Sequence, residues 1–218
     1  MDILWLVDFI VNLGDHLSAL VSQYGLLTYA ILFFIVFLET GFVVFPFLPG
    51  DSLIFAAATL AAMNPQALDP FVLLAIFIVA AVLGDTVNYW IGWYTGPRIF
   101  RGEKVRFLRK EYLDRAKAFY DRHGGKTIFL ARFMPVIRTF APFVAGMGAM
   151  NYRRFIVYNV LGAVAWVSLF MGMGYWFGNL DFVQHNFTLV LLAIIIISFV
   201  PGILAYLWER YRKKPSKN

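Results

Sequence analysis

The segment Thr127–Met150 reads TIFLARFMPVIRTFAPFVAGMGAM, and it decides how the chain folds. The segment is apolar, yet it contains two arginines and two prolines. The basic block Arg98–Lys126 precedes it and the pair Arg153–Arg154 follows it. Basic segments flank membrane helices on the cytoplasmic side, so Thr127–Met150 starts and ends on one face. It is therefore predicted to be a re-entrant hairpin, whose charges and prolines are buried in protein or line a wet cavity.

The composition places the chain in a membrane. Of its 218 residues, 61% are hydrophobic and 15% are charged, whereas a soluble domain has about 45–50% apolar and about 25% charged residues. Lipid cannot satisfy backbone polar groups, and the alternating pattern of a membrane β-barrel is absent, so the predicted fold class is an all-α integral membrane protein. The absence of cysteine and the wide separation of the three histidines predict no metal site and no cofactor.

The basic residues are distributed unevenly. All 19 Lys and Arg lie between Arg98 and Lys217, while residues 1–97 hold seven of the 13 acids. We interpret this asymmetry as membrane topology rather than nucleic-acid binding, which places the basic tail after Trp208 in the cytoplasm. The span Phe71–Gly96 then runs from outside to inside. Leu26–Met63 consequently starts and ends on the outer face, which predicts a second re-entrant hairpin that points the opposite way.

The result is a single domain over residues 1–218 that contains an inverted repeat. Each half consists of an amphipathic helix, a re-entrant hairpin and a transmembrane helix, and such repeats with broken helices are typical of transporters. Residues 1–97 form the first repeat with a hairpin at about 26–63; residues 98–178 form the second, with a hairpin at about 127–150; a final transmembrane helix covers 187–208, and 209–218 is a basic tail.

Five charged residues are predicted at membrane depth: Glu39, Asp51, Asp85, Arg132 and Arg138. Each charge near the bilayer centre costs about 2.5–3.5 kcal/mol on insertion scales, so a function is expected of them. If the hairpins meet tip to tip, Arg132 and Arg138 form a phosphate-binding pair, because guanidinium binds phosphate in a bidentate fork. Glu39 and Asp51 are the predicted proton-coupling pair, since desolvation disfavours a charged carboxylate. The alternative is that these four residues form structural salt bridges.

Two further sets of residues carry weaker predictions. Asp85 and Asn88 lie three residues apart on one helix face, where a hydrogen bond between helices and a transport role are equally open. Proline and glycine are predicted to break the hairpin helices. The predicted breaks are Pro46, Pro49 and Gly50 in the first hairpin and Pro135, Pro142 and Gly146 in the second.

Four motifs follow one another in a specific order and spacing. They are FLETG at Phe37–Gly41, PFLPGD at Pro46–Asp51, GDTVNYWIG at Gly84–Gly92 and ARFMPVIRTFAPFVAG at Ala131–Gly146. Together they resemble the bacterial DedA family, the prokaryotic branch of the SNARE-associated, VTT-domain proteins. The resemblance covers nearly the whole chain.

This resemblance implies a multi-pass protein of the bacterial inner membrane with two opposed re-entrant hairpins and a cytoplasmic C-terminus. It implies lipid translocation, of undecaprenyl phosphate in bacterial members and of phospholipids in eukaryotic relatives, and dependence on the proton motive force. The functional acids of the family match Glu39 and Asp51, and its essential arginines match Arg132 and Arg138.

The leading interpretation is therefore a flippase, not an enzyme, whose partners are a membrane lipid and protons and not nucleic acid. No Walker motif is present, so a gradient rather than ATP is the expected energy source. A proton-coupled cation antiporter or channel is the alternative, although fixed arginines repel cations in a low-dielectric site. A lipid phosphatase is less favoured, because no histidine nucleophile lies in either hairpin. A homo-oligomer remains open.

Overall fold

The computed structural model describes residues 13–42, 50–101, 120, 122, 124–186, 189, 190 and 193. Within these ranges every regular element is a helix, which confirms the predicted all-α fold class. The predicted breaks Pro46 and Pro49, the tail 209–218 and most of the predicted final span 187–208 lie outside the described residues. The same holds for residues 2–12, the first half of the predicted first amphipathic helix, and for most of the basic block that begins at Arg98.

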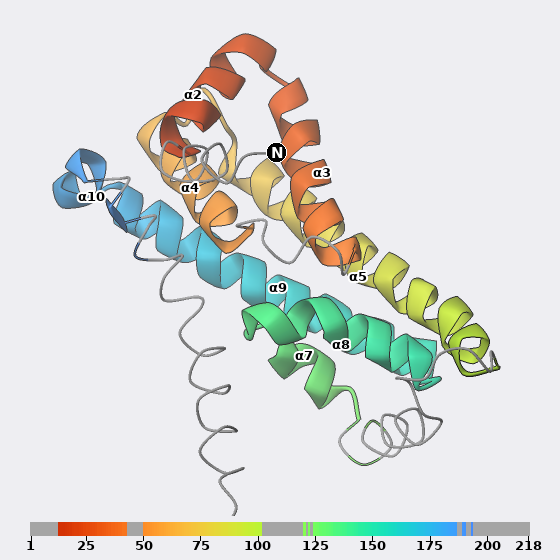
Figure 1. Ribbon diagram of the computed structural model, residues 1–218. Coiled ribbons are helices and arrows are strands. Elements are labelled where there is room, and N and C mark those ends of the chain that lie inside the picture. Colours follow the sequence, from red (N-terminus) through yellow and green to blue (C-terminus); the bar gives the residue numbers. More distant parts are fainter. Residues whose placement is uncertain are drawn as a thin grey trace, which may run out of the picture.

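The helices fall into two length classes (Figure 1). The long helices α5 and α9 have 32 and 27 residues, which makes them about 48 and about 40 Å long at about 1.5 Å per residue. Their segments Pro70–Gly96 and Tyr152–Gly178 are long and apolar enough to cross a bilayer. The helices α3, α4 and α8 have 13 to 15 residues, too few for a hydrocarbon core of about 30 Å. The bounds are α2 Leu13–Tyr24, α3 Leu27–Gly41, α4 Gly50–Met63, α5 Pro70–Arg101, α7 Lys126–Ala131, α8 Pro135–Met147, α9 Tyr152–Gly178 and α10 Asp181–His185.

The short helices pack reciprocally on the two long ones. In the first half of the chain, α3 packs on its own long helix α5, whereas α4 packs on α9 of the second half. In the second half, α7 packs on α9 and α8 crosses to α5. Figure 1 shows α5 and α9 running diagonally through the molecule, with α3 and α4 above them and α7 and α8 below. Two halves related by a twofold axis would show this exchange of partners, while the inverted repeat and its orientation relative to a membrane stay predictions.

Paired glycines allow the crossing helices to approach closely. Gly92 and Gly96 of α5 face α8, where an added Cβ would overlap Phe143 and Met147 respectively. Gly174 and Gly178 occupy the same spacing near the end of α9, and they face Phe55 and Thr59 of α4. Small residues four apart let membrane helices pack backbone to backbone. The two glycine pairs therefore serve equivalent crossings in the two halves.

A glycine in the left-handed backbone conformation precedes each short-helix pair. The first short-helix pair is α3 with α4, and the second is α7 with α8. Gly25 ends α2 with a φ of 52° and Gly124 precedes α7 with a φ of 63°. Each donates its N–H to a carbonyl four residues earlier, Gly25 to Val21 at 3.0 Å and Gly124 to Tyr120 at 2.8 Å. Glycine adopts this conformation without the Cβ clash that other residues meet, so it ends a helix and turns the chain.

The break of the second pair is shorter than the sequence predicted. Helix α7 ends at Ala131 and α8 begins at Pro135, so only three residues separate them. Pro135 occupies the first position of α8, where its missing N–H costs no hydrogen bond. The prediction that Pro142 and Gly146 break the hairpin is wrong, because both lie inside α8. Neighbouring helices can satisfy a carbonyl that proline leaves free within a membrane protein.

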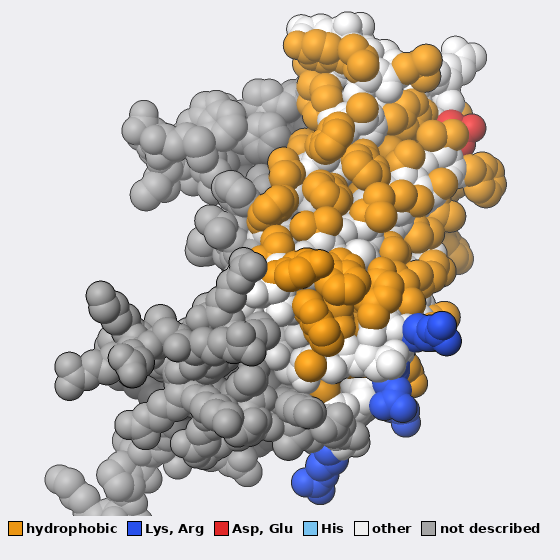
Figure 2. Space-filling view, turned by 90° about the vertical axis from the view of Figure 1, so that its right-hand side faces the viewer, with side chains coloured by type: hydrophobic (Ala, Val, Ile, Leu, Met, Phe, Trp, Pro, Cys, Tyr) orange, Lys and Arg blue, Asp and Glu red, His pale blue; other side chains and the backbone are white. Residues whose placement is uncertain are grey.

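Two apolar clusters form the interior, and polar residues lie between them. The larger cluster includes Ala81 of α5 and Ala163 of α9, whereas the smaller one includes Tyr89 and Phe155 of the same helices. Asp85 and Asn88 follow Ala81 on α5, and Asn159 precedes Ala163 on α9; all three are buried. Large apolar side chains also cover the outside, and Figure 2 shows them as a broad band across one face. The molecule thus has an apolar exterior and a buried polar layer between the two apolar clusters.

Candidate functional site

Arg138 joins the two short-helix pairs. It lies on α8 of the second pair, and its Nη2 donates to Glu39 at the end of α3. Its Nη1 donates to Asp51 Oδ1 at the start of α4 over 2.5 Å. Glu39 is only 1% exposed. One guanidinium therefore holds two carboxylates from both arms of the opposite pair, and the ends of the two pairs meet at this cluster.

Arg132 belongs to a second cluster with different partners. It lies in the turn between α7 and α8, and its Nη2 donates to both Asp85 of α5 and Asn159 of α9. The distance to Asn159 Oδ1 is 2.5 Å. The Asn159 amide is itself oriented, because its Nδ2 donates to the Val82 carbonyl at 3.1 Å. Arg132 thus ties both long helices together and forms a single ion pair.

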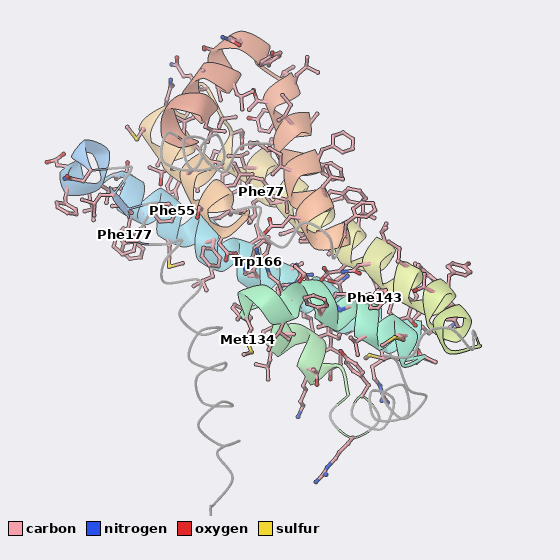
Figure 3. All side chains as sticks on the ribbon, in the orientation of Figure 1. Phe55, Phe77, Met134, Phe143, Trp166 and Phe177 are labelled. Carbon is pink, nitrogen blue, oxygen red and sulfur yellow. The ribbon has the colours of Figure 1, made fainter. Side chains whose placement is uncertain are left out.

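Trp166 of α9 connects the two clusters. Its Nε1 donates to Asp51 Oδ1 at 3.0 Å, and its ring lies 5.0 Å from the Arg138 Cζ and 5.7 Å from the Arg132 Cζ. Both distances fall within the range of a cation–π interaction. Trp166 is fully buried, and Figure 3 shows it near the centre of the molecule, where α4 and α8 approach α9. The indole is therefore a shared wall for both guanidinium groups.

Asn88 positions the backbone on either side of the Arg138 cluster. Its Nδ2 donates to the Thr40 carbonyl at 3.2 Å and to the Thr139 carbonyl at 2.7 Å. Thr40 follows Glu39 on α3, and Thr139 follows Arg138 on α8. Asn88 therefore makes the kind of hydrogen bond between helices that the sequence left open, and Asp85, three residues earlier, pairs with Arg132.

The site is closed. A cavity of about 10 Å³ remains between the two clusters, lined by Thr40, Asp85, Arg132, Arg138, Thr139 and Trp166. That is the space of about one water molecule. Within the described part of the chain, the Nε–H groups of Arg132 and Arg138 have no hydrogen-bond partner. Each arginine thus keeps one unpaired donor beside a cavity that is too small for a phosphate group.

The charges of the site do not balance. Three carboxylates, those of Glu39, Asp51 and Asp85, meet two guanidinium groups, so the fully ionised site carries a net charge of −1. The Arg132 pair is neutral, and the surplus negative charge belongs to the Arg138 cluster. A buried charge that lacks a counter-ion is costly, so this cluster favours the uptake of one proton or cation.

All five charged residues predicted at membrane depth are buried or nearly so in this region. The structure adds two residues that the sequence analysis missed, Asn159 and Trp166. Asn159 was visible as an isolated amide inside the apolar run that follows Arg154. Trp166 lies seven residues later, two helical turns away on the same face.

The comparisons with known proteins identify the family of this chain. The VTT domain model matches residues 48–176. Protein DedA of Escherichia coli strain K12 is 50% identical over 205 residues, which cover 94% of this chain and 94% of the relative. The chain belongs to the DedA family of VTT-domain membrane proteins. This family membership confirms the resemblance that the four motifs indicated.

More distant DedA-family relatives are also membrane proteins by name. An uncharacterized membrane protein of Mycobacterium leprae is 39% identical over 180 residues, which cover 83% of this chain and 79% of the relative. Inner membrane protein YghB of Salmonella typhimurium is 31% identical over 215 residues, which cover 97% and 94%. No solved structure shows a significant match. The VTT match includes Asp51, Asp85, Arg132 and Arg138, whereas Glu39 precedes it.

Proposed function

We propose that this DedA-family protein translocates a phosphorylated lipid, undecaprenyl phosphate or a related anionic phospholipid, across the bacterial inner membrane. The observation that carries the proposal is Arg138, a buried guanidinium held between two carboxylates where the two short-helix pairs meet. A guanidinium fork binds a phosphate and a carboxylate in the same way. Glu39 and Asp51 therefore occupy the positions that phosphate oxygens would take.

Competition for Arg138 provides the transport step. The present cavity holds about one water, so phosphate enters only when the carboxylates leave the guanidinium. Protonation of Glu39 or Asp51 removes the charge that holds each carboxylate on Arg138, and the two helix pairs can then separate. Binding of lipid phosphate and binding of protons are thereby coupled at one residue.

The charge count supports a proposed number of protons for the exchange. The site carries −1 with every group ionised, because three carboxylates face two guanidinium groups. Protonation of Glu39 and Asp51 brings it to +1, which balances a phosphodiester or a phosphate monoester that keeps one proton, while the Arg132–Asp85 pair stays neutral. In this proposal the phosphate is carried and not cleaved, so the protein is a transporter rather than an enzyme, with its C-terminus in the cytoplasm.

The test is translocation of radiolabelled undecaprenyl phosphate in proteoliposomes, with and without a pH gradient. We expect the native chain to move the lipid faster when a gradient is present. Arg138→Gln removes the fork and reduces the initial rate by about tenfold or more, the equivalent of one lost charge-assisted hydrogen bond. Glu39→Gln keeps transport but loses its response to the gradient. Lys126→Gln, an exposed cation outside the cluster, is the matched control.

The same proteoliposomes distinguish the proposed flippase from a cation antiporter. A pH-sensitive dye inside the vesicles reports proton flux, and potassium or sodium is added outside. Cation-driven proton flux without lipid movement would show that the protein is an antiporter and not a flippase. Arg132 and Arg138 would then have a structural role only. Lipid movement that is unaffected by Arg138→Gln would remove Arg138 from the phosphate site.

A further inference from the structure

A second polar cavity lies at the start of α9, away from the ion-pair clusters. Its volume is about 680 Å³, and its described lining includes Tyr120, Asn151, Arg153, Arg154 and Tyr158. Arg153 precedes Asn159 of the central site by six residues, about 9 Å along the helix axis. The two cavities share no lining residue. This cavity is therefore a separate feature of the molecule.

The arginines of this cavity form no ion pair with another described residue. Both side chains are exposed, and the ion pairs between described residues involve Arg132 and Arg138 instead. The Asn151 side chain accepts hydrogen bonds from the backbone N–H groups of Arg153 at 3.0 Å and Arg154 at 3.4 Å. The N–H groups of Arg153 and Arg154 are thus already capped, and the charged donors in the described lining are the two guanidinium groups.

An aromatic cluster places the cavity at the membrane surface. The rings of Trp90 and Trp93 of α5 contact each other. The centroid of the Trp90 ring lies 5.3 Å from that of Tyr152, which immediately precedes Arg153. Both tryptophans are more than one-third exposed. Exposed tryptophan and tyrosine gather at the level of lipid headgroups. Figure 2 agrees, because Lys and Arg side chains appear at one end of the molecule, below the apolar band.

We infer that this cavity binds the phosphodiester headgroup of an anionic membrane lipid through Arg153 and Arg154. Two guanidinium groups at headgroup depth have the charge opposite to that of a phosphodiester, and both can donate hydrogen bonds to its oxygens. The cavity is open and large, unlike the closed space at Arg138, so a headgroup enters without a rearrangement of the helices. The bound lipid anchors the junction of α8 and α9, and this role does not depend on transport.

The experiment is a titration of the detergent-purified full chain with phosphatidylglycerol, followed by native mass spectrometry. Phosphatidylcholine serves as the neutral lipid. The test variant Arg153→Gln/Arg154→Gln is compared with Arg122→Gln/Lys126→Gln, which also loses two exposed positive charges but leaves the described cavity lining intact. We expect the test variant to bind phosphatidylglycerol about tenfold more weakly or worse. The control variant keeps native affinity within about twofold, and phosphatidylcholine binds all three proteins equally weakly.

Three outcomes overturn the proposal. Equal losses in both double variants would mean that diffuse charge, rather than this cavity, attracts the lipid. Native affinity in the test variant would remove both arginines from lipid binding. Displacement of phosphatidylglycerol by millimolar inorganic phosphate would assign the cavity to a soluble anion. A thermal melt of each variant establishes that the folded chain is being titrated, since both arginine side chains are exposed and their loss leaves the Asn151 cap in place.

Discussion

The two buried arginines lie on the same tryptophan ring, yet their surroundings differ. Arg138 meets two carboxylates from both arms of the first short-helix pair. Arg132 meets one carboxylate and one amide from the two long helices. The Arg138 cluster has surplus negative charge and lies where the ends of short helices meet. The Arg132 cluster is neutral and contacts the two long helices, which pack along their length.

This difference assigns separate tasks to residues that look equivalent in the sequence. The Arg132–Asp85 pair is neutral and joins the α7–α8 turn to α5, so we expect Arg132 to stabilise the scaffold. A guanidinium shared by two carboxylates changes its bonding whenever one carboxylate takes up a proton, which is why we propose Arg138 as the residue that responds to protons and to phosphate. Each of the following predictions either separates the two clusters or shows that they act as one.

The largest effect on stability is expected at the Arg132 pair. Arg132→Met leaves the Asp85 carboxylate buried without a cation, which costs about 3–5 kcal/mol of unfolding free energy. The double variant Arg132→Met/Asp85→Leu removes both charges and recovers most of that loss. Chemical unfolding in detergent measures both values. Lys126→Met, at an exposed position, serves as the control and is expected to change stability by about 0.5 kcal/mol or less. A double variant as unstable as the single one would disprove a purely structural pair.

The sequence predicted much of this arrangement. The uneven distribution of Lys and Arg placed both ends of Thr127–Met150 on one face, and the structure has a pair of short helices there. Charged residues within apolar runs pointed to Glu39, Asp51 and Arg138, and Arg138 does contact both carboxylates. These signals are strong because a charge in lipid is expensive, so its position in the sequence is informative.

Other features depend on how helices cross, and a single sequence does not contain that information. The partner of Arg132 is Asp85 rather than an acid of the first pair, because α7 and α8 are placed by their contacts with α9 and α5. Trp166 is one aromatic residue among many in an apolar span, and only its contacts distinguish it. Pro142 was misassigned as a break because proline rules from soluble helices are relaxed within a membrane bundle.

The second prediction concerns lysine replacements, which keep the charge and remove the planar fork. Arg138→Lys is expected to reduce lipid translocation by about tenfold, since an ammonium cannot hold phosphate in a bidentate manner. Arg132→Lys still neutralises Asp85 and is expected to retain transport within about threefold, less than one kcal/mol. Initial rates in proteoliposomes measure both variants. Equal losses would show that the two arginines bind phosphate together, as the sequence alone suggested.

The third prediction uses one glycine beside each cluster. A Cβ at Gly50 would overlap the Glu39 carboxylate, so Gly50→Ala displaces a buried side chain and is expected to cost about 1–3 kcal/mol of unfolding free energy. A Cβ at Gly162 would lie 3.5 Å from the Arg132 Nε, an ordinary contact. Gly162→Ala is therefore expected to be neutral or stabilising by up to about 1 kcal/mol, because alanine favours the helix. Unfolding curves of the two variants give the comparison directly, and an equal cost at both positions would show that the Arg138 cluster is not packed more tightly.

The smallest effect is expected at Trp166, where the two clusters meet. Trp166→Phe keeps an aromatic face for both guanidinium groups and removes the Nε1–H that donates to Asp51. The loss of this hydrogen bond is expected to cost about 0.5–1.5 kcal/mol. A double-mutant cycle assigns that cost to a cluster: Trp166→Phe should couple with Asp51→Asn and not with Asp85→Asn. Equal coupling to both acids would mean that the indole links the two arginines into one unit. Proton uptake at the Arg138 cluster would then extend to Arg132, and the division between a responsive cluster and a scaffold cluster would no longer hold.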